Sequence, residues 1–179
     1  LALLKEAGYN SPADVPPLEF SVSSSAVASQ PGKVIHQQLQ DFGLRVNWKT
    51  VDVPTLQENR RNGTYQIHMD GGGMSWPDPD YLRQIFQSVS GSTHAVGVKY
   101  KNERLDELLT LGSQVSDVAE RKALYREAEE ILLDEAPWIW VLWRPQAEAL
   151  AKYVRGYQVH PSALGTHNVG RFERVWLDK

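Results

Sequence analysis

The stretch QLQDFGLRVNWKTVD, residues 38–52, carries the signals that decide the fold. Apolar residues recur at helical spacing up to this point, and Gly43 is a typical helix stop, so a helix is predicted over 32–42. From residue 44 onward apolar and polar residues alternate, which predicts a strand over 44–51. Asp52 then provides the start signal of another helix. A helix, a strand and a second helix therefore follow one another with short connections.

The flanking sequence extends the same alternation of elements. LEFSVSS predicts a strand over 18–23, and SSAVASQPG after it has the composition of a loop. The helix that begins near Asp52 is closed by Gly63, and TYQIHMD predicts a third strand over 65–69. The order β-α-β-α-β within about seventy residues implies right-handed crossovers and a largely parallel sheet.

The second half of the chain is predicted to be mainly helical. Helices are expected over 102–114, with Asn102 as its cap, and over 118–135, which Pro137 closes. WIWVLW, residues 138–143, is apolar on both faces and predicts a strand buried on both sides. Its tryptophans are therefore interpreted as core residues rather than as a stacking platform.

Composition excludes several classes of protein. The 179 residues have 41% hydrophobic and 23% charged content, which is ordinary for a soluble globular domain. A formal net charge of -3 gives no footprint for nucleic acid, and no apolar run approaches the roughly 20 residues of a membrane span. The chain has no cysteine, so disulfides and thiolate metal sites are ruled out. Its first residues resemble the end of a helix, so we expect the chain to begin inside a longer protein.

One loop stands out because it directly follows the third predicted strand. GGGMSWPDPDYL, residues 71–82, combines a glycine run, a tryptophan and a proline-bounded acidic turn. Ligands of open α/β sheets bind outside the carboxyl ends of the strands, and backbone without Cβ atoms can approach a ligand closely. A plain connecting loop and a ligand-binding loop both fit this composition.

Six segments, in the same order, resemble a known family. They are LLKEAGY at 3–9, QLQDFGLRVNWKTVD at 38–52, WPDPDYL at 76–82, YKNERLDELL at 100–109, DVAERKALYREAEEILLDEAPWIWV at 117–141 and VRGYQVHP at 154–161. Together they resemble the C-terminal lobe of the family 5 extracellular solute-binding proteins, the substrate receptors of ABC importers for peptides, nickel and related solutes. The resemblance implies an α/β lobe of the type II periplasmic-binding-protein kind, with a mixed, mostly parallel sheet flanked by helices.

The resemblance also implies a mechanism, a location and partners. Two lobes close on a small solute through a hinge, and the closed form docks on a membrane ABC permease; no bond is made or broken, and no cofactor takes part. The protein is expected to be periplasmic or exposed at the cell surface, soluble or lipid-anchored. Residues 1–151 would form the ligand-binding lobe, and residues 152–179 would return to the missing N-terminal lobe. Without that lobe, apolar residues of this tail could support self-association.

Two loops of this lobe face the cleft in the resemblance. Ser25 matches the place of an arginine, and Ser75 that of an aspartate, which anchor the termini of dipeptides in other members. A buried ammonium without a counter-ion costs several kcal/mol, so a hydroxyl-rich solute such as an oligosaccharide is favoured over a simple dipeptide. Asp70 could replace the lost acid, so an oligopeptide remains the alternative. The candidate ligand-binding residues are Ser23, Ser24, Ser25, Asp70, Gly71, Gly72, Gly73, Met74, Ser75 and Trp76, with His68 behind them.

Other functions are less well supported by the residues. The five histidines show no pair at the i, i+4 spacing of a helical zinc site, so no metal site is predicted, although nickel receptors occur in the family. Asp78 and Asp80 could suggest the paired carboxylates of a hydrolase, but in a proline-bounded turn they are better interpreted as caps of the following helix. A stand-alone interaction module is the third class that stays open.

Overall fold

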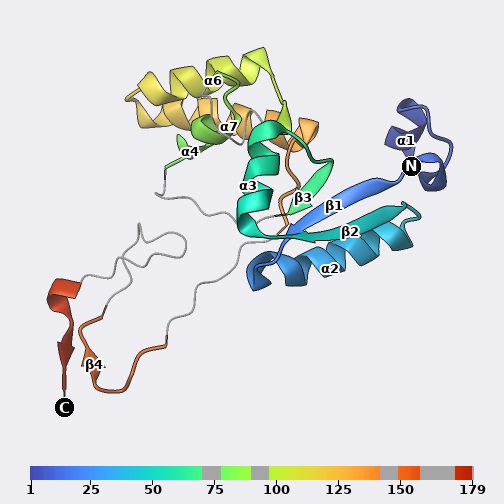
Figure 1. The fold of residues 1–179 in the computed structure, drawn as a ribbon. Coiled ribbons are helices and arrows are strands. Elements are labelled where there is room, and N and C mark those ends of the chain that lie inside the picture. The colour runs from blue at the N-terminus through green and yellow to red at the C-terminus, as the bar shows by residue number, and fades with distance from the viewer. Residues whose placement is uncertain (70–77, 90–96, 142–148, 158–171, 179) are drawn as a thin grey trace. The chain divides into compact units, whose positions relative to one another are not determined.

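The computed structural model describes residues 1–69, 78–89, 97–141, 149–157 and 172–178, and its ribbon is drawn in Figure 1. The chain divides into two compact units, each with its own hydrophobic core. The first unit comprises residues 1–71 and 96–99, and the second comprises residues 72–95 and 100–179.

The first unit is built on a three-stranded parallel sheet in the order β2-β1-β3. The strands are β1 (Leu18–Ser23), β2 (Val46–Val51) and β3 (Ile67–Met69), close to the predicted ranges. Helix α2 (Ala26–Asp41) connects β1 to β2, and helix α3 (Val53–Asn62) connects β2 to β3. The two helices cover opposite faces of the sheet, as Figure 1 shows. The connections from β1 to β2 and from β2 to β3 run in opposite directions across the sheet, so right-handed crossovers require this arrangement.

Alternation along the strands separates an apolar from a polar face. Phe20 and Val22 of β1 and Val46 of β2 are buried against α2, with Trp48 partly buried beside them. Glu19 points to the other face, where it pairs with Lys49 across the strands. This period of two is what the sequence pattern predicted.

Helix α2 begins earlier than predicted. The sequence suggested a loop up to Gly32, but the helix starts at Ala26 and runs through Pro31. A Cβ at Gly32 would lie 3.1 Å from the Trp48 ring and 3.2 Å from Val22, so the absent side chain lets the helix approach the sheet. The Pro-Gly pair therefore marks close packing and not a break.

The ends of the other helices agree with the sequence. Asp52 Oδ1 accepts a hydrogen bond from the Thr55 amide at 2.8 Å and caps α3, and Gly63 closes it in the left-handed conformation with φ of 60°. At the start of the chain the short helix α1 (Ala2–Glu6) is followed by Gly8 with φ of 87°, and a 3-10 turn spans Pro12–Asp14.

The second unit contains a helical core. Helix α4 (Tyr81–Phe86) packs against α6 (Glu103–Gln114), which pairs with α7 (Val118–Glu135). The interior is formed by apolar side chains from all three helices, namely Ile85, Phe86, Leu105, Leu108, Leu109, Tyr125, Ala128 and Leu132. As predicted, the Asn102 side chain caps α6 by accepting from the Leu105 amide at 2.9 Å.

The predicted buried strand at 138–143 differs from the structure. Residues 138–141 are not in a strand, and residues 142 and 143 lie outside the described part of the chain. Trp138 packs edge-on against Phe86 with ring centroids 5.0 Å apart, so its prediction as a core residue is confirmed. Trp140 is 50% exposed and Ile139 is 75% exposed. Among the described residues, only the side of Trp138 is covered by the core of the second unit. A strand buried on both sides would need a covering layer on each face.

The last described residues form a small antiparallel pair. Strand β4 (Val154–Arg155) pairs with β5 (Trp176–Leu177), and a 3-10 turn at Phe172–Arg174 precedes β5. Trp176 is 57% exposed. These two strands pair with each other and with no other strand among the described residues.

Candidate functional site

The carboxyl end of β1 brings three serines to the start of a helix. Ser23 is fully buried, and its Oγ accepts a hydrogen bond from the Ser25 amide at 3.2 Å. The Ser24 amide donates to the Val51 carbonyl at 2.8 Å, which holds this turn against the end of β2, while the Ser24 side chain is exposed. Ser25 is the N-cap residue of α2, but its hydroxyl makes no capping bond. The turn therefore combines a fixed backbone with hydroxyls that are not consumed by capping.

The carboxyl end of β3 lies beside the same turn. In the ladder Phe20 pairs with Ile67 and Val22 pairs with Met69, so the chain leaves β3 next to Ser23. The predicted ligand-binding residues that follow, Asp70 to Trp76, lie outside the described residues. The structure thus places the three serines and the end of β3 at one edge of the sheet.

The strand order makes this edge of the sheet the expected position of a ligand. From β1 the chain crosses through α2 to β2 on one side, and from β2 it crosses through α3 to β3 on the other side. Connections that leave neighbouring strands in opposite directions open a crevice at their carboxyl ends, which is the usual ligand position in open α/β sheets. The direction of the connections changes between β1 and β3, the two strands that the predicted ligand-binding segments directly follow.

The helix start adds an electrostatic preference at this edge. The first amide groups of an α-helix have no partner in the helix, and the aligned peptide dipoles give this end a partial positive charge. The turn from Ser23 to Ser25 contributes no charged side chain. The arrangement can therefore donate hydrogen bonds to a neutral or negatively polarised oxygen without a charged anchor.

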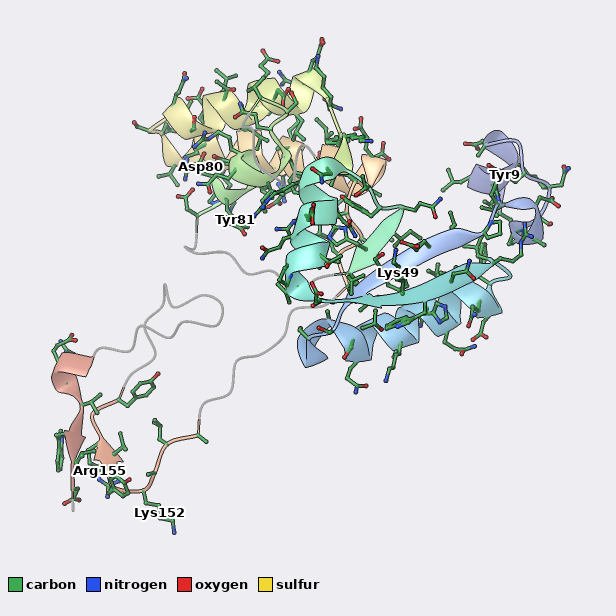
Figure 2. The ribbon with its side chains drawn as sticks, viewed as in Figure 1. Tyr9, Lys49, Asp80, Tyr81, Lys152 and Arg155 are labelled. Carbon is green, nitrogen blue, oxygen red and sulfur yellow. The ribbon has the colours of Figure 1, made fainter. Side chains whose placement is uncertain are left out.

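His68 lies on the polar face of the sheet, next to Ser21 in the ladder. Its ring contacts the Tyr65 ring edge-on, with centroids 4.4 Å apart. The same face carries the Glu19–Lys49 pair, with 3.1 Å between Nζ and Oε1, and Figure 2 labels Lys49 on β2. The proposed supporting role of His68 behind the ligand-binding residues remains a prediction.

A shallow hollow of about 360 Å³ lies elsewhere on the first unit. It is lined by Glu19, Gly63, Thr64, Tyr65 and Gln66. These residues flank the amino ends of β1 and β3, opposite the serine turn. Burial raises the pKa of Tyr65, whose hydroxyl lacks a hydrogen-bond partner among the described residues. The strand order gives no reason to place the ligand at this end.

The two aspartates of the acidic turn do not form a catalytic pair. Asp78 is bound by Arg121 of α7, whose hydrogen bonds lower the pKa of the Asp78 carboxyl. Asp80 is bound by Arg83, which likewise lowers its pKa. A hydrolase of the paired-carboxylate kind needs one carboxyl with a raised pKa to serve as the acid. Asp80 occupies the predicted N-cap position of α4, but it makes no side-chain capping bond there, and each aspartate is held by its own arginine instead.

The described histidines and acids show no metal site. Among the described ranges, no three side chains of the ligating types come together. His36 contacts the Val46 carbonyl at 2.9 Å through Nε2 and packs edge-on against Trp48. His94, His160 and His167 lie outside the described residues. In the same part of the chain, no helix is both long and apolar enough to cross a membrane.

Comparison with known proteins places these features in a family. The sequence profile of "Bacterial extracellular solute-binding proteins, family 5 Middle" matches residues 1–94, which contain the sheet, the serine turn and α4. The chain belongs to the family 5 extracellular solute-binding proteins. This confirms the resemblance seen in the six segments of the sequence.

Individual relatives of this family 5 chain are similar over most of its length. It is 28% identical over 162 residues to the "Probable deoxycholate-binding periplasmic protein YgiS" of Escherichia coli, covering 89% of the chain and 29% of that protein. It is 27% identical to "Di/tripeptide-binding protein 2" of Pseudomonas aeruginosa, covering 99% of the chain and 33% of that protein. The chain thus spans about a third of the length of these curated relatives.

A solved structure supports the fold. "Listeria monocytogenes OppA bound to peptide" superposes with a TM-score of 0.72 at 24% identity, covering 99% of the family 5 chain and 32% of OppA. The periplasmic-binding-protein-like α/β lobe predicted from the sequence is therefore confirmed.

Proposed function

We propose that this chain is the C-terminal lobe of an extracytoplasmic receptor that binds a solute and delivers it to an ABC permease. The observation that carries the proposal is the strand order β2-β1-β3, which brings the serine turn beside the carboxyl end of β3. Residues 1–151 form the lobe, and residues 152–179 return to the N-terminal lobe. The receptor works in the periplasm or at the cell surface, soluble or lipid-anchored, and two lobes close on the solute through a hinge.

The solute we favour is rich in hydroxyl groups, such as an oligosaccharide. The turn from Ser23 to Ser25 offers the hydroxyls of Ser24 and Ser25 and the positive end of α2, but no charged side chain. The ammonium of a peptide bound here would lose its hydration without gaining a counter-ion, which costs several kcal/mol. Gly71 to Gly73 and Trp76 would add bare backbone and a flat apolar ring.

An oligopeptide is the second candidate. Two of the curated relatives are named for binding di- and tripeptides, and another is named a dipeptide-binding protein. Asp70 follows β3 directly and would supply a carboxylate for a peptide amine. The name of the deoxycholate-binding relative shows that the family is not confined to peptides.

The test is calorimetry on the full-length receptor with maltotriose, trialanine, dialanine, deoxycholate and Ni²⁺ as probes. Maltotriose is expected to bind, and dialanine is not. Ser24→Ala and Ser25→Ala should each weaken that binding severalfold, whereas Ser113→Ala on the exposed face of α6 should leave it unchanged. Binding of trialanine alone would replace the oligosaccharide by a peptide, and binding of no probe in this set would contradict the receptor proposal.

The isolated 179-residue chain provides a second check. A single lobe cannot bury the 70–90% of surface that tightly bound small ligands lose to solvent, so weak or no binding is expected. Micromolar binding by this chain alone would contradict the division into two lobes that share the solute.

A further inference from the structure

Trp48 of β2 packs between the sheet and α2 in the first unit. Its indole meets the Phe20 ring of β1 and the His36 ring of α2 edge-on, with centroids 5.7 and 5.6 Å apart. Its Nε1 donates to Thr50 Oγ1 at 2.8 Å. Edge-to-face contacts and hydrogen bonds both depend on direction, so they favour one orientation of the ring. Figure 1 shows α2 running alongside β1 and β2.

The same ring limits how closely α2 approaches the sheet. A Cβ at Gly32 would lie 3.1 Å from Trp48 Cη2 and 3.2 Å from Val22 Cγ1, which is closer than ordinary van der Waals contact. Gly32 and His36 are four residues apart, so both lie on the side of the helix that meets the indole. Pro31 cannot donate a backbone hydrogen bond. Packing against the ring therefore supports the helix where its hydrogen-bond ladder is incomplete.

The start of the same helix carries the turn Ser23–Ser25. Ser25 is the N-cap residue, and its carbonyl accepts from the Ser29 amide at 3.0 Å, so this end of the turn moves with the helix. The other end is bound to the sheet, because the Ser24 amide donates to the Val51 carbonyl at 2.8 Å. A shift of α2 relative to the sheet must therefore change the geometry of the turn.

We propose that Trp48 is a positioning residue for solute binding, whose indole fixes α2 on the sheet and thereby places the hydroxyls of Ser24 and Ser25. Ser25 precedes Gly32 by about two helical turns, or roughly 10 Å. Binding groups must be held within about 0.5 Å of their productive positions. A side chain at Gly32 would force a shift of a few tenths of an ångström, which is comparable with that tolerance. This inference rests on the proposed function, because it takes the two hydroxyls to contact the solute.

A compensating pair of substitutions tests the contact between the ring and the helix. Gly32→Ala adds a methyl group against the indole and should push α2 away from the sheet. Trp48→Phe removes the part of the ring that approaches Gly32, so α2 loses its support there. In the double variant the new methyl group occupies the space that the smaller ring leaves. Val34→Ala, at an exposed position of α2, is the matched control.

The first experiment needs no solute. Amide hydrogen exchange of the full-length receptor is compared among the wild type and the four variants. Exchange of the Ser24 and Ser29 amides should rise about fivefold in Gly32→Ala and in Trp48→Phe, while the interior of β1 stays protected. In the double variant it should return toward the wild-type rate. Unchanged exchange in the turn would overturn the proposal, and so would an equal rise over β1, which indicates a general loss of stability.

The second experiment measures affinity by calorimetry with maltotriose or trialanine, whichever the wild type binds. Gly32→Ala should weaken binding about fivefold with little change in the midpoint of thermal unfolding, because the gain in helix propensity offsets the crowding. Trp48→Phe should also weaken binding about fivefold, and Val34→Ala should match the wild type. The double variant should bind more tightly than either single variant. Losses that simply add in the double variant, or a lowered midpoint with unchanged affinity, would overturn the proposal.

The two experiments separate this inference from the function on which it rests. If exchange in the turn changes as expected but the wild type binds no probe, the proposed function fails and the link of Trp48 to binding fails with it. If the wild type binds a probe and the variants bind it equally well, the receptor function stands and only the role of Trp48 is refuted.

Discussion

At the scale of single residues, each carboxylate of the acidic turn has its own arginine partner. Asp78 and Asp80 are two residues apart, yet each is held by a different arginine, Arg121 and Arg83. The hydrogen bonds lower the pKa of both carboxyls. Both therefore stay ionised as acceptors, and the turn depends on their negative charge.

Acid should weaken the contribution of Asp78. Because its folded-state pKa is below the unfolded value of about 3.9, the stabilisation is fully present above pH 5 and is lost as pH falls through the folded pKa. Asp78→Asn should therefore lower the free energy of unfolding by up to about 1 kcal/mol at pH 7, after allowance for its exposure, and by less at pH 2. Urea unfolding at the two pH values measures the difference. An equal loss at both would show that charge is not the cause.

Gly112 should not tolerate a side chain. A Cβ there would lie 2.9 Å from Cε2 of the buried Tyr125 ring, which also donates to Asp80. Overpacking costs about 1–3 kcal/mol, while alanine in place of glycine in a helix gains about 1 kcal/mol, so Gly112→Ala should lose about 1 kcal/mol. Ser113→Ala is the control, with a change within about 0.5 kcal/mol. Urea unfolding measures the free energy of unfolding of each variant. A gain in stability for Gly112→Ala would show that the Tyr125 ring can move away without cost.

At the scale of elements, α2 shows how packing overrides a local signal. A proline inside a helix removes one backbone hydrogen bond, and Pro-Gly normally indicates a turn. The helix nevertheless continues from Ala26 because Gly32 allows it to lie close to Trp48 and Val22. Burial of the apolar face of α2 outweighs the missing bond at Pro31.

Replacing this proline should therefore stabilise the protein. Alanine in a helix interior is favoured over proline by about 3 kcal/mol, and the more flexible unfolded chain returns up to about 1 kcal/mol of that. Pro31→Ala should raise the free energy of unfolding by about 2–3 kcal/mol, measured by urea unfolding and circular dichroism. Gln30→Ala, at the exposed neighbouring position, is the matched control. A loss of stability would mean that the ring of Pro31 makes a packing contribution.

At the scale of the whole molecule, the chain contains two separate cores. One is centred on Phe20 and Val22 of the sheet, and the other on Leu105 and Leu108 of the helix pair. The chain passes from one unit to the other near residues 71 and 96 and again near residue 100. Each unit thus depends on its own apolar interior for stability.

Core truncations should reveal these units. Leu108→Ala should cost about 2–5 kcal/mol and speed amide exchange in α6 and α7, with a smaller effect on β1 and β2. Phe20→Ala, at a cost of about 3–5 kcal/mol, should show the opposite distribution. Amide hydrogen exchange, measured by mass spectrometry under native conditions, shows which elements lose protection in each variant. Equal loss of protection over the whole chain in both variants would contradict the division.

Residues 152–179 should promote association between copies of the chain. Trp176 and Tyr153 are 57% and 45% exposed, on or beside the small β4–β5 pair. Exposed apolar side chains and free strand edges favour contact between molecules. The 179-residue chain is expected to associate as its concentration rises, and a version that ends at Ala151 should remain monomeric. Sedimentation velocity measures the association state of the two chains over a range of concentrations. If both are monomers of equal stability, residues 152–179 do not mediate contacts between molecules.

The sequence by itself determined the elements whose signals are local. The alternation in LEFSVSS correctly predicted β1, and the capping residues Asp52 and Asn102 correctly predicted the starts of α3 and α6. These signals are readable because side-chain period and capping depend on neighbours within a few residues. The six family-like segments likewise led to the family. The serine turn was singled out through the resemblance to the family, and its role in binding stays a prediction.

Only the tertiary structure decided the features that join distant residues. The pairing of Val22 with Met69, which brings the serine turn beside the carboxyl end of β3, depends on the strand order and not on spacing along the chain. Arg121 and Asp78 are 43 residues apart, so no local pattern links them. The irregular course of residues 138–141 has the same origin, because a run of apolar residues forms a buried strand only where other layers cover both of its faces.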